Sequence, residues 1–438
     1  METFLPLFLP IAQSALKFLW EFILTWWWLF LPIMLLGTFK HFWLWWRIDK
    51  FLSEKRWEVL EIRVPGEIDN PFRRMESVFA GIWQIKIGNN KKEKWFEGKI
   101  QIGMSCDIVS IEGKVHFFVR FEQDDRQLIE TSIYAQFPNA EIAEVEDYAK
   151  QLPADIPNKE WDFWASSYRL TRPDPYPIKT YKQFFEEQAG TVEDEPKRVD
   201  PLGQLLEGMA KLGPGEQMWV QIMISPVDDE APHVKQGEEI VAKVVRRPEK
   251  AKQKGALEDV GAVMSTLATG QTPEEVAPEK EELLPPEMRI TPGERVVVAA
   301  IEEKIGKMAF ACEIRSAYIA KRDVFSGAMK AIPMSYFNQF TTINLNGIIV
   351  RSATWTKVKT IFSWYLDERR LYLRKRRHYR YYRWRFGDFF PRSMGSFALN
   401  IEELASIFHF PGRLTAPSAA LPRVEAKKGE APSVLPTE

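Results

Sequence analysis

The sequence has few of the residue types that build metal sites and reactive centres. Among its 438 residues are two cysteines and five histidines, and no pair of them has the spacing of zinc ligands. The two cysteines, Cys106 and Cys312, each fall on the apolar phase of an alternating, strand-like segment. We therefore expect both thiols to be reduced core residues, and we predict no metal and no cofactor.

The phosphate loop of ATP-hydrolysing enzymes is also missing. A Gly-Lys pair begins at Gly98, Gly113 and Gly306, but none of these pairs precedes Ser or Thr in a G-x-x-x-x-G-K-[ST] pattern. The G-x-S-x-G and H-E-x-x-H patterns of hydrolases and zinc proteases are absent as well. We predict no catalytic residues and expect that the protein is not an enzyme.

A long uncharged run is present near the N-terminus, from Phe22 to Phe39. A helix of this length would cross most of the roughly 30 Å hydrocarbon core of a bilayer. Tryptophans cluster near both ends of the run, as indole rings do at membrane–water interfaces: Trp20, Trp26, Trp27, Trp28, Trp43, Trp45 and Trp46. We predict a transmembrane anchor within residues 1–50; a buried core helix is the alternative.

The charges beside this run predict its orientation. Basic residues follow it within residues 40–56, whereas only Lys17 lies close before it. By the positive-inside rule, we expect a single-pass protein of the cell inner membrane with its N-terminus outside and its later domains in the cytoplasm. Residues 3–16 are apolar but contain two prolines, so we expect them to lie in the membrane interface; a tight hairpin is the alternative.

Residues 57–150 have the pattern strand, helix, strand, strand, helix, strand. The clearest strand covers 100–108, where apolar residues alternate with polar or small ones, and Gly113 marks the turn into the next strand at 115–121. This order is typical of a ferredoxin-like domain, in which two helices cover one face of an antiparallel sheet.

Residues 157–345 repeat this order around a Glu-, Lys- and Pro-rich insertion at 228–290, which has too few apolar residues to fold alone. The predicted fold class is α+β, an N-terminal transmembrane helix followed by two ferredoxin-like domains. A basic-aromatic stretch and a C-terminal helix are expected within 346–412, and an extended tail within 413–438.

The formal net charge is −1, so any attraction to an anionic partner must be local. Residues 369–386 (RRLYLRKRRHYRYYRWRF) are strongly basic, contain no acidic residue and are interleaved with aromatic rings. Arginines neutralise phosphates, while aromatic rings stack on exposed bases or lie among lipid headgroups. The candidate residues for binding nucleic acid or anionic lipid are Arg374, Lys375, Arg376, Arg377, Arg380, Tyr381, Arg383, Trp384 and Arg385. Alternatively, the rings pack on the sheet and the charges are solvated or paired.

Several segments resemble a known bacterial module. They are WFEGKIQIGMSCDIVSIEGKVHFFVR (95–120), IYAQFPNAEIAEVEDY (133–148), DPLGQLLEGMAKLGPGEQMWVQI (200–222) and LNIEELASIFHFPG (399–412). They are similar to the membrane-anchored N-terminal module of type IV secretion and conjugation coupling-type ATPases. In fused relatives that module precedes a DNA-translocating ATPase of the FtsK and HerA type, which would begin here beyond Glu438.

The resemblance implies a membrane-anchored cytoplasmic platform that recruits or assembles a separately encoded HerA- or FtsK-like ATPase. We also expect a homo-oligomer, because sheets of this type associate through their edges and helix faces, and a ring of them would match a ring-shaped motor. The alternative function is a membrane-tethered protein that binds nucleic acid through residues 369–386.

Overall fold

The computed structural model describes residues 5–65, 68–86, 88, 90–186, 200–228, 231–245, 290–358, 364–385 and 395–412. The predicted tail at 413–438, most of the predicted insertion at 228–290 and Phe386 of the basic tract lie outside these residues. The chain divides into two compact units, one formed by Met1–Arg56 and Ile87–Ile102 and the other by Trp57–Lys86 and Gly103–Glu438.

The first unit is built on one long helix, α1 (Leu5–Glu54), and a short π-helical segment, η2 (Glu93–Glu97). The indole N–H of Trp43 donates to the carbonyl of Trp95 at 3.0 Å. Gly98 ends η2 with φ +71°, and a Cβ there would lie 2.4 Å from the backbone of Arg47. Only glycine permits this close approach of η2 to α1.

The predicted transmembrane anchor is wrong, and with it the single-pass location in the inner membrane. Within the described residues, none of the helices combines the length and the apolar character needed to cross a bilayer. In α1 the uncharged run is bounded by Glu21 and Lys40, which leaves it near the minimum spanning length. Its tryptophans are amphipathic, because each indole carries a polar N–H. The predicted anchor residues Trp20, Trp26, Trp28, Trp43, Trp45 and Trp46 are exposed on α1, which also carries Trp27.

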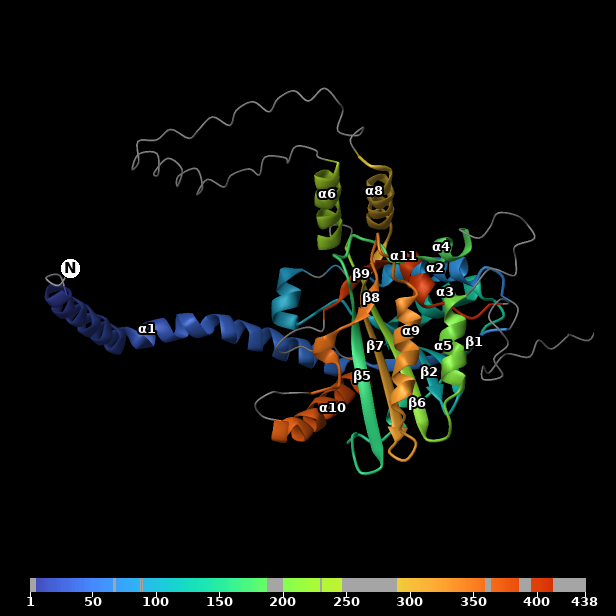
Figure 1. Ribbon diagram of the computed structural model, residues 1–438, viewed down its shortest axis with the longest axis horizontal. Coiled ribbons are helices and arrows are strands. Elements are labelled where there is room, and N and C mark those ends of the chain that lie inside the picture. The colour runs from blue at the N-terminus through green and yellow to red at the C-terminus, as the bar shows by residue number, and fades with distance from the viewer. Residues whose placement is uncertain are drawn as a thin grey trace, which may run out of the picture. The chain divides into compact units, whose positions relative to one another are not determined.

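The second unit contains a nine-stranded sheet in which every pair of neighbouring strands is antiparallel. Its strands are β1 (Trp57–Arg63), β2 (Met104–Ile111), β3 (Lys114–Glu122), β4 (Glu141–Glu144), β5 (Trp161–Leu170), β6 (Glu216–Pro226), β7 (Ala309–Lys321), β8 (Ile348–Val350) and β9 (Phe397–Asn400). They lie in the order β4-β1-β3-β2-β6-β7-β5-β8, and β9 pairs with β7. Figure 1 shows the long central strands β5, β6 and β7 side by side.

The predicted fold class was a transmembrane helix followed by two ferredoxin-like domains. Besides the transmembrane helix, the division into two separate sheets is wrong. The strands of each half have the order fourth, first, third, second, but the two halves share a single sheet. They join where β2 pairs with β6, from Met104 opposite Ile224 to Ile111 opposite Gln217. The outermost strand of each half would otherwise expose a row of unpaired backbone groups, and this pairing satisfies them.

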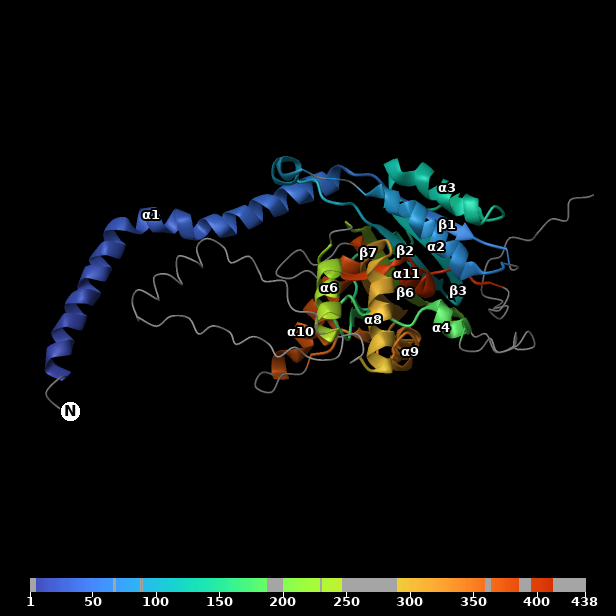
Figure 2. The same ribbon diagram turned by 90° about the horizontal axis from the view of Figure 1, so that it is seen from above.

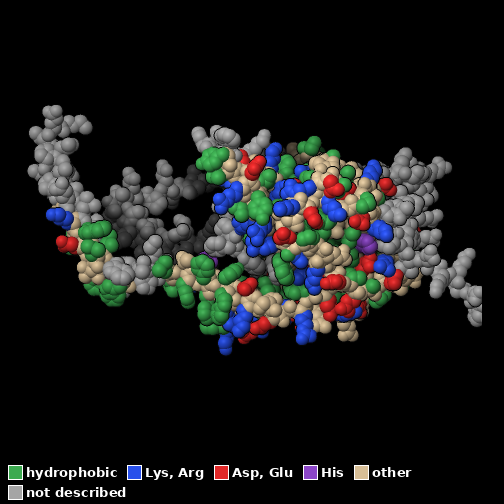
Figure 3. All heavy atoms as spheres, turned by 90° about the horizontal axis from the view of Figure 1, so that it is seen from below, with side chains coloured by type: hydrophobic (Ala, Val, Ile, Leu, Met, Phe, Trp, Pro, Cys, Tyr) green, Lys and Arg blue, Asp and Glu red, His purple; other side chains and the backbone are tan. Residues whose placement is uncertain are grey.

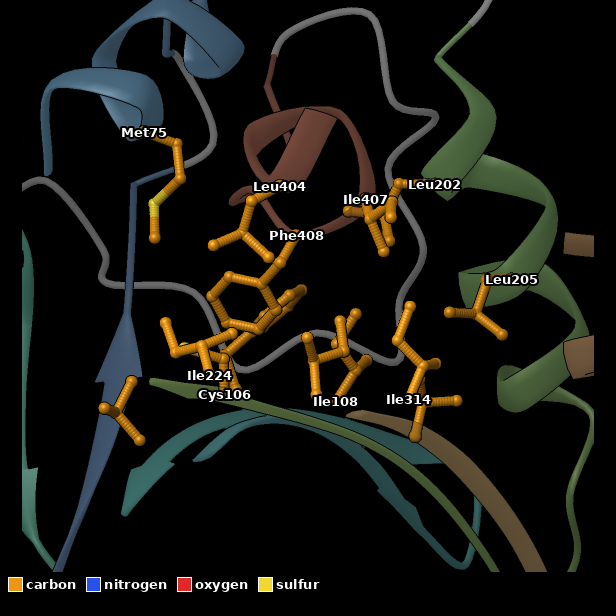
Figure 4. Close-up of a cluster of buried hydrophobic side chains, with 14 of the residues drawn as sticks. Met75, Cys106, Ile108, Leu202, Leu205, Ile224, Ile314, Leu404, Ile407 and Phe408 are labelled. Atoms are coloured by element: carbon orange, nitrogen blue, oxygen red, sulfur yellow. The ribbon is translucent and has the colours of Figure 1, made fainter. Parts of the chain in front are cut away.

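One face of the sheet is covered by helices α2 (Pro71–Ile82), α3 (Arg126–Gln136), α5 (Pro201–Ala210), α9 (Ala331–Asn338) and α11 (Ile401–Ile407). Met75, Leu205, Leu404 and Phe408 point from this helical layer toward a strand surface that includes Cys106 and Ile314 (Figure 4). Both cysteines are buried and free, which confirms that they are core residues.

Helices α6 (Pro232–Val244) and α8 (Pro292–Ile305) lie beside each other and pack around Val241, Val245 and Ile301 (Figures 1 and 2). Thr291 and Glu294 form the capping box that begins α8, and the side chain of Asp200 caps α5 by accepting from the N–H of Leu202 at 2.8 Å.

Candidate nucleic-acid interface

The other face of the sheet is covered in part by the basic tract, which forms helix α10 (Asp367–Trp384). One side of α10 buries Tyr379 and Tyr382 completely. The ring of Phe163 on β5 lies 5.5 Å from that of Tyr379 and 5.9 Å from that of Tyr382, both edge to face. The hydroxyl of Tyr379 donates to the carbonyl of Pro153 at 2.8 Å. Part of the aromatic content of the tract therefore fixes α10 on the sheet.

The C-terminal end of α10 is held by side chains that project from the sheet. Arg315 donates to the carbonyl of Tyr381 at 3.3 Å, and Gln221 donates to that of Tyr382 at 3.1 Å. Arg120 donates to the last carbonyl of the helix at 3.4 Å. The final carbonyls of a helix lack partners within it, and the negative end of the helix dipole favours cations. The sheet supplies both hydrogen bonds and positive charge at this end.

Arg385 follows α10 in the left-handed conformation, with φ 55°. Its side chain turns into the protein, where Nε donates to Asp107 at 2.8 Å and the two amino groups donate to Asp147 at 2.7 and 3.0 Å. The guanidinium lies 4.6 Å from the ring centre of Tyr148, whose hydroxyl donates to Asp107 at 3.0 Å. We call these four residues the Arg385 cluster. Asp107 and Arg385 are almost fully buried, so each charge depends on the other for compensation.

Two other basic residues of the tract also make contacts within the protein. Arg374 donates to the carbonyls of Lys357 at 2.8 Å and Trp355 at 3.2 Å. Lys375 forms an ion pair with Asp162 on β5 at 2.6 Å. Both side chains are half-buried, so they hold α10 and the neighbouring chain in place.

The opposite side of α10 forms what we call the basic stripe: Arg369, Tyr372, Leu373, Arg376, Arg377, Arg380, Arg383 and Trp384. Spacings of three, four and seven residues place these side chains on one side of the helix. Arg383 is half-buried and the others are exposed, with Tyr372 at 43%, Leu373 at 52% and Trp384 at 58%. Figure 3, seen from the side on which α10 lies in Figure 1, shows Lys and Arg side chains gathered beside hydrophobic ones.

Within the stripe, Arg377 stacks on Tyr381, with the guanidinium carbon 5.5 Å from the ring centre, and its Nε donates to the Tyr381 hydroxyl at 3.2 Å. The acidic residues of α10, Asp367 and Glu368, lie in its first turn, where they complement the positive end of the helix dipole. The stripe thus presents guanidinium groups and apolar rings together, without an acidic side chain between them.

The nine candidate residues therefore divide into two groups. Arg376, Arg377, Arg380, Arg383 and Trp384 belong to the stripe, with Tyr381 beside it. Arg374, Lys375 and Arg385 instead anchor the helix. Sequence reasoning left Arg369 and Tyr372 out of the candidates, although helical periodicity over the tract would have grouped them with Arg376 and Arg380. In the described part of the chain, no cluster of His, Cys, Asp and Glu could hold a metal ion.

The Arg385 cluster predicts a specific dependence of stability on pH. Burial by itself would raise the pKa of Asp147, but the charge and hydrogen bonds of Arg385, together with the N–H of Ala149 and the charge of Arg120, lower that pKa below its usual range. A carboxyl whose pKa is lower in the folded chain stabilises the fold above its unfolded pKa, about 3.9 for Asp, and this stability is lost as the pH falls through the folded value. Below pH of about 4, the wild type should therefore lose more stability than Asp147→Asn. Urea unfolding at several pH values measures this, and parallel curves for the two proteins would contradict it.

Comparison with known families identifies a matching family model. A family model described as a domain of unknown function, DUF8128, matches residues 54–415. This range includes the whole nine-stranded sheet and α10. A search of curated proteins finds no match to the chain.

Proposed function

The chain belongs to the DUF8128 family, and we propose that it binds nucleic acid through the basic stripe of α10. The observation that carries the proposal is the division of the tract between two sides of one helix. Tyr379, Tyr382 and Arg385 bind the helix to the sheet, while the arginines and rings of the other side remain exposed. Because the anchored side is fixed, the helix backbone that carries the stripe is in place before any partner arrives, which lowers the entropy cost of binding.

The chemistry of the stripe suits a phosphate backbone. Guanidinium groups match phosphate oxygens with two parallel hydrogen bonds, and exposed aromatic rings stack on bases of any sequence. From Arg369 to Trp384 the helix rises about 22 Å, at about 1.5 Å per residue. Since successive phosphates on one strand of B-DNA are about 3.4 Å apart along the axis, this length can meet several phosphates.

The sequence analysis also predicted other partners, and these stay predictions. A HerA- or FtsK-like ATPase follows from the resemblance to coupling-type modules, and a homo-oligomer from the way such sheets associate. Nucleic-acid binding by α10 is compatible with both, since a protein that holds a strand can present it to a translocating motor. Anionic lipid was the other candidate partner for the stripe, so the test below also measures binding to vesicles that contain anionic lipid.

The test removes three charges from the stripe by Arg376→Gln, Arg380→Gln and Arg383→Gln. The matched control removes three charges elsewhere by Arg73→Gln, Lys211→Gln and Lys243→Gln, which replace exposed residues of α2 and α6 and at the end of α5. Binding of a fluorescein-labelled DNA strand to the full chain is measured by anisotropy between roughly 50 and 200 mM NaCl. Each lost phosphate contact lowers the log–log salt slope by about 0.7 on a single strand, so the stripe variant should lose about 2.

The control should keep the wild-type slope, and the circular dichroism of both variants should match the wild type. An unchanged slope in a folded stripe variant would contradict the proposal. So would salt-dependent binding to vesicles with anionic lipid but not to DNA, which would instead identify lipid as the partner.

A further inference from the structure

A shallow pocket of about 460 Å³ adjoins the basic stripe at Tyr372. It is lined by Asp155, Pro157, Asn158, Lys159, Arg322 and Tyr372. These residues come from the turn before β5, the residue after β7 and the second turn of α10. These three segments are distant from one another in sequence, so only the fold brings them together.

The floor of this pocket is fixed by hydrogen bonds. The side-chain oxygen of Asn158 accepts from the backbone N–H groups of Glu160 at 2.9 Å and Trp161 at 2.7 Å. The side chain of Arg322 donates from Nε to the carbonyl of Asn158 at 2.8 Å, and the backbone N–H of Arg322 donates to the carbonyl of Glu160 at 2.8 Å. The turn and the end of β7 are therefore joined before any ligand binds.

The rim of the pocket carries groups that the protein leaves available. Lys159, Arg322 and Tyr372 are exposed. In the described part of the chain, the Lys159 ammonium, the two amino groups of Arg322 and the Tyr372 ring form no hydrogen bond, ion pair or ring contact with another side chain. The two cations outnumber the single carboxylate of the pocket, Asp155, and an aromatic face lies beside them where the basic stripe begins.

We infer that the nucleic acid bound by α10 is single-stranded and that one of its bases stacks on Tyr372 at this pocket, with Lys159 and Arg322 on the adjacent phosphates. This inference rests on the proposed function and narrows it to one class of ligand. A base can reach Tyr372 only when it is unpaired, because the bases of a duplex are stacked inside the helix.

The charges of α10 also argue against binding in the major groove of double-stranded DNA. A recognition helix usually enters the major groove with its N-terminal residues against the bases. The first turn of α10 carries Asp367 and Glu368, which would repel the phosphates that border the groove. The positive charges and exposed rings of α10 lie C-terminal to these two acidic residues, along the basic stripe. A strand laid along the stripe therefore meets the arginines without placing its phosphates over Asp367 and Glu368.

The test compares a fluorescein-labelled DNA strand with its blunt duplex, using the full chain and Tyr372→Ala. We expect the wild type to prefer the single strand, and Tyr372→Ala to weaken single-strand binding by about 5- to 150-fold, the range of one lost base stack. The salt slope should stay unchanged, because no charge is removed. Tyr372→Phe should bind like the wild type, since it keeps the ring, and Tyr134→Ala is the matched control, because Tyr134 on α3 is 42% exposed.

The outcomes separate this inference from the proposed function. Wild-type affinity in Tyr372→Ala, together with a reduced slope in the three-arginine variant, would overturn the inference and leave nucleic-acid binding in place. Equal or tighter binding of the duplex would overturn it as well. Lack of binding to either DNA would overturn both proposals.

Discussion

Replacing Arg385 by alanine is expected to lower the free energy of unfolding by about 3–5 kcal/mol, the range for breaking a buried ion pair by removal of one partner. The substitution leaves Asp107 fully buried with only hydroxyl donors, the hydroxyl of Tyr148 at 3.0 Å and that of Ser105. It also removes two charged hydrogen bonds from Asp147. Urea unfolding of the full chain, followed by circular dichroism, measures the change.

Arg383→Ala is the matched control, because Arg383 belongs to the same tract but is half-exposed in the stripe. We expect it to change stability by less than about 1 kcal/mol, as is usual for surface residues. Equal effects of the two substitutions would show that Arg385 is not an anchor. Because Arg385 holds the end of α10, its loss should also weaken DNA binding, although its side chain does not reach the surface.

Replacing Lys304 by methionine is expected to cost about 3–5 kcal/mol for the same reason. Lys304 at the end of α8 pairs with Glu403 of α11 at 3.0 Å, and both side chains are almost fully buried. Glu403 also accepts from the backbone N–H groups of Ile178 at 2.8 Å and Asn400 at 2.9 Å. Methionine matches much of the lysine stem, so the main loss is the compensating charge.

The pH dependence of Lys304→Met identifies that charge as the cause. Burial raises the pKa of Glu403, whereas Lys304 opposes the rise. Without Lys304 the pKa should rise further, so the native carboxyl binds a proton more readily than the unfolded one, and folding is favoured as the pH falls. We therefore expect a smaller loss of stability near pH 5 than near pH 8, measured by urea unfolding.

Two further variants test whether the unpaired charge of Glu403 causes the loss of stability. Adding Glu403→Gln to Lys304→Met removes the unpaired charge and should recover part of the lost stability. Lys243→Met, an exposed substitution on α6, should change stability by less than about 1 kcal/mol. A loss that does not depend on pH and is not recovered in the double variant would point to packing in place of charge.

Local rules were sufficient for many individual elements. Alternation predicted a strand at 115–121, and β3 extends from Lys114 to Glu122. The caps of α5 and α8, at Asp200 and at Thr291 with Glu294, likewise act within one turn of the chain. Features of this kind depend on residues close together in sequence, so they can be recognised in the sequence alone.

The predictions that failed depend on the mean apolar character of a long segment or on pairing between strands that are distant in sequence. The anchor was inferred from a missing charge and from tryptophans, but α1 is not apolar enough to cross a membrane. Two separate domains were expected because each half has its own strand pattern, yet strand edges are free to pair, and β2 pairs with β6.

By itself, the sequence determined that residues 369–386 concentrate arginines and aromatic rings without an acidic residue. Only the tertiary structure decided which of them are exposed. Arg385 and Arg380 are five residues apart in one basic run, but Asp107 and Asp147 draw Arg385 into the protein while Arg380 stays exposed. Helical periodicity defines two sides of α10, but the buried side is the one that meets Phe163, and Arg385 after the helix meets Asp107 and Asp147. Those partners lie more than two hundred residues away, so no local pattern could identify them.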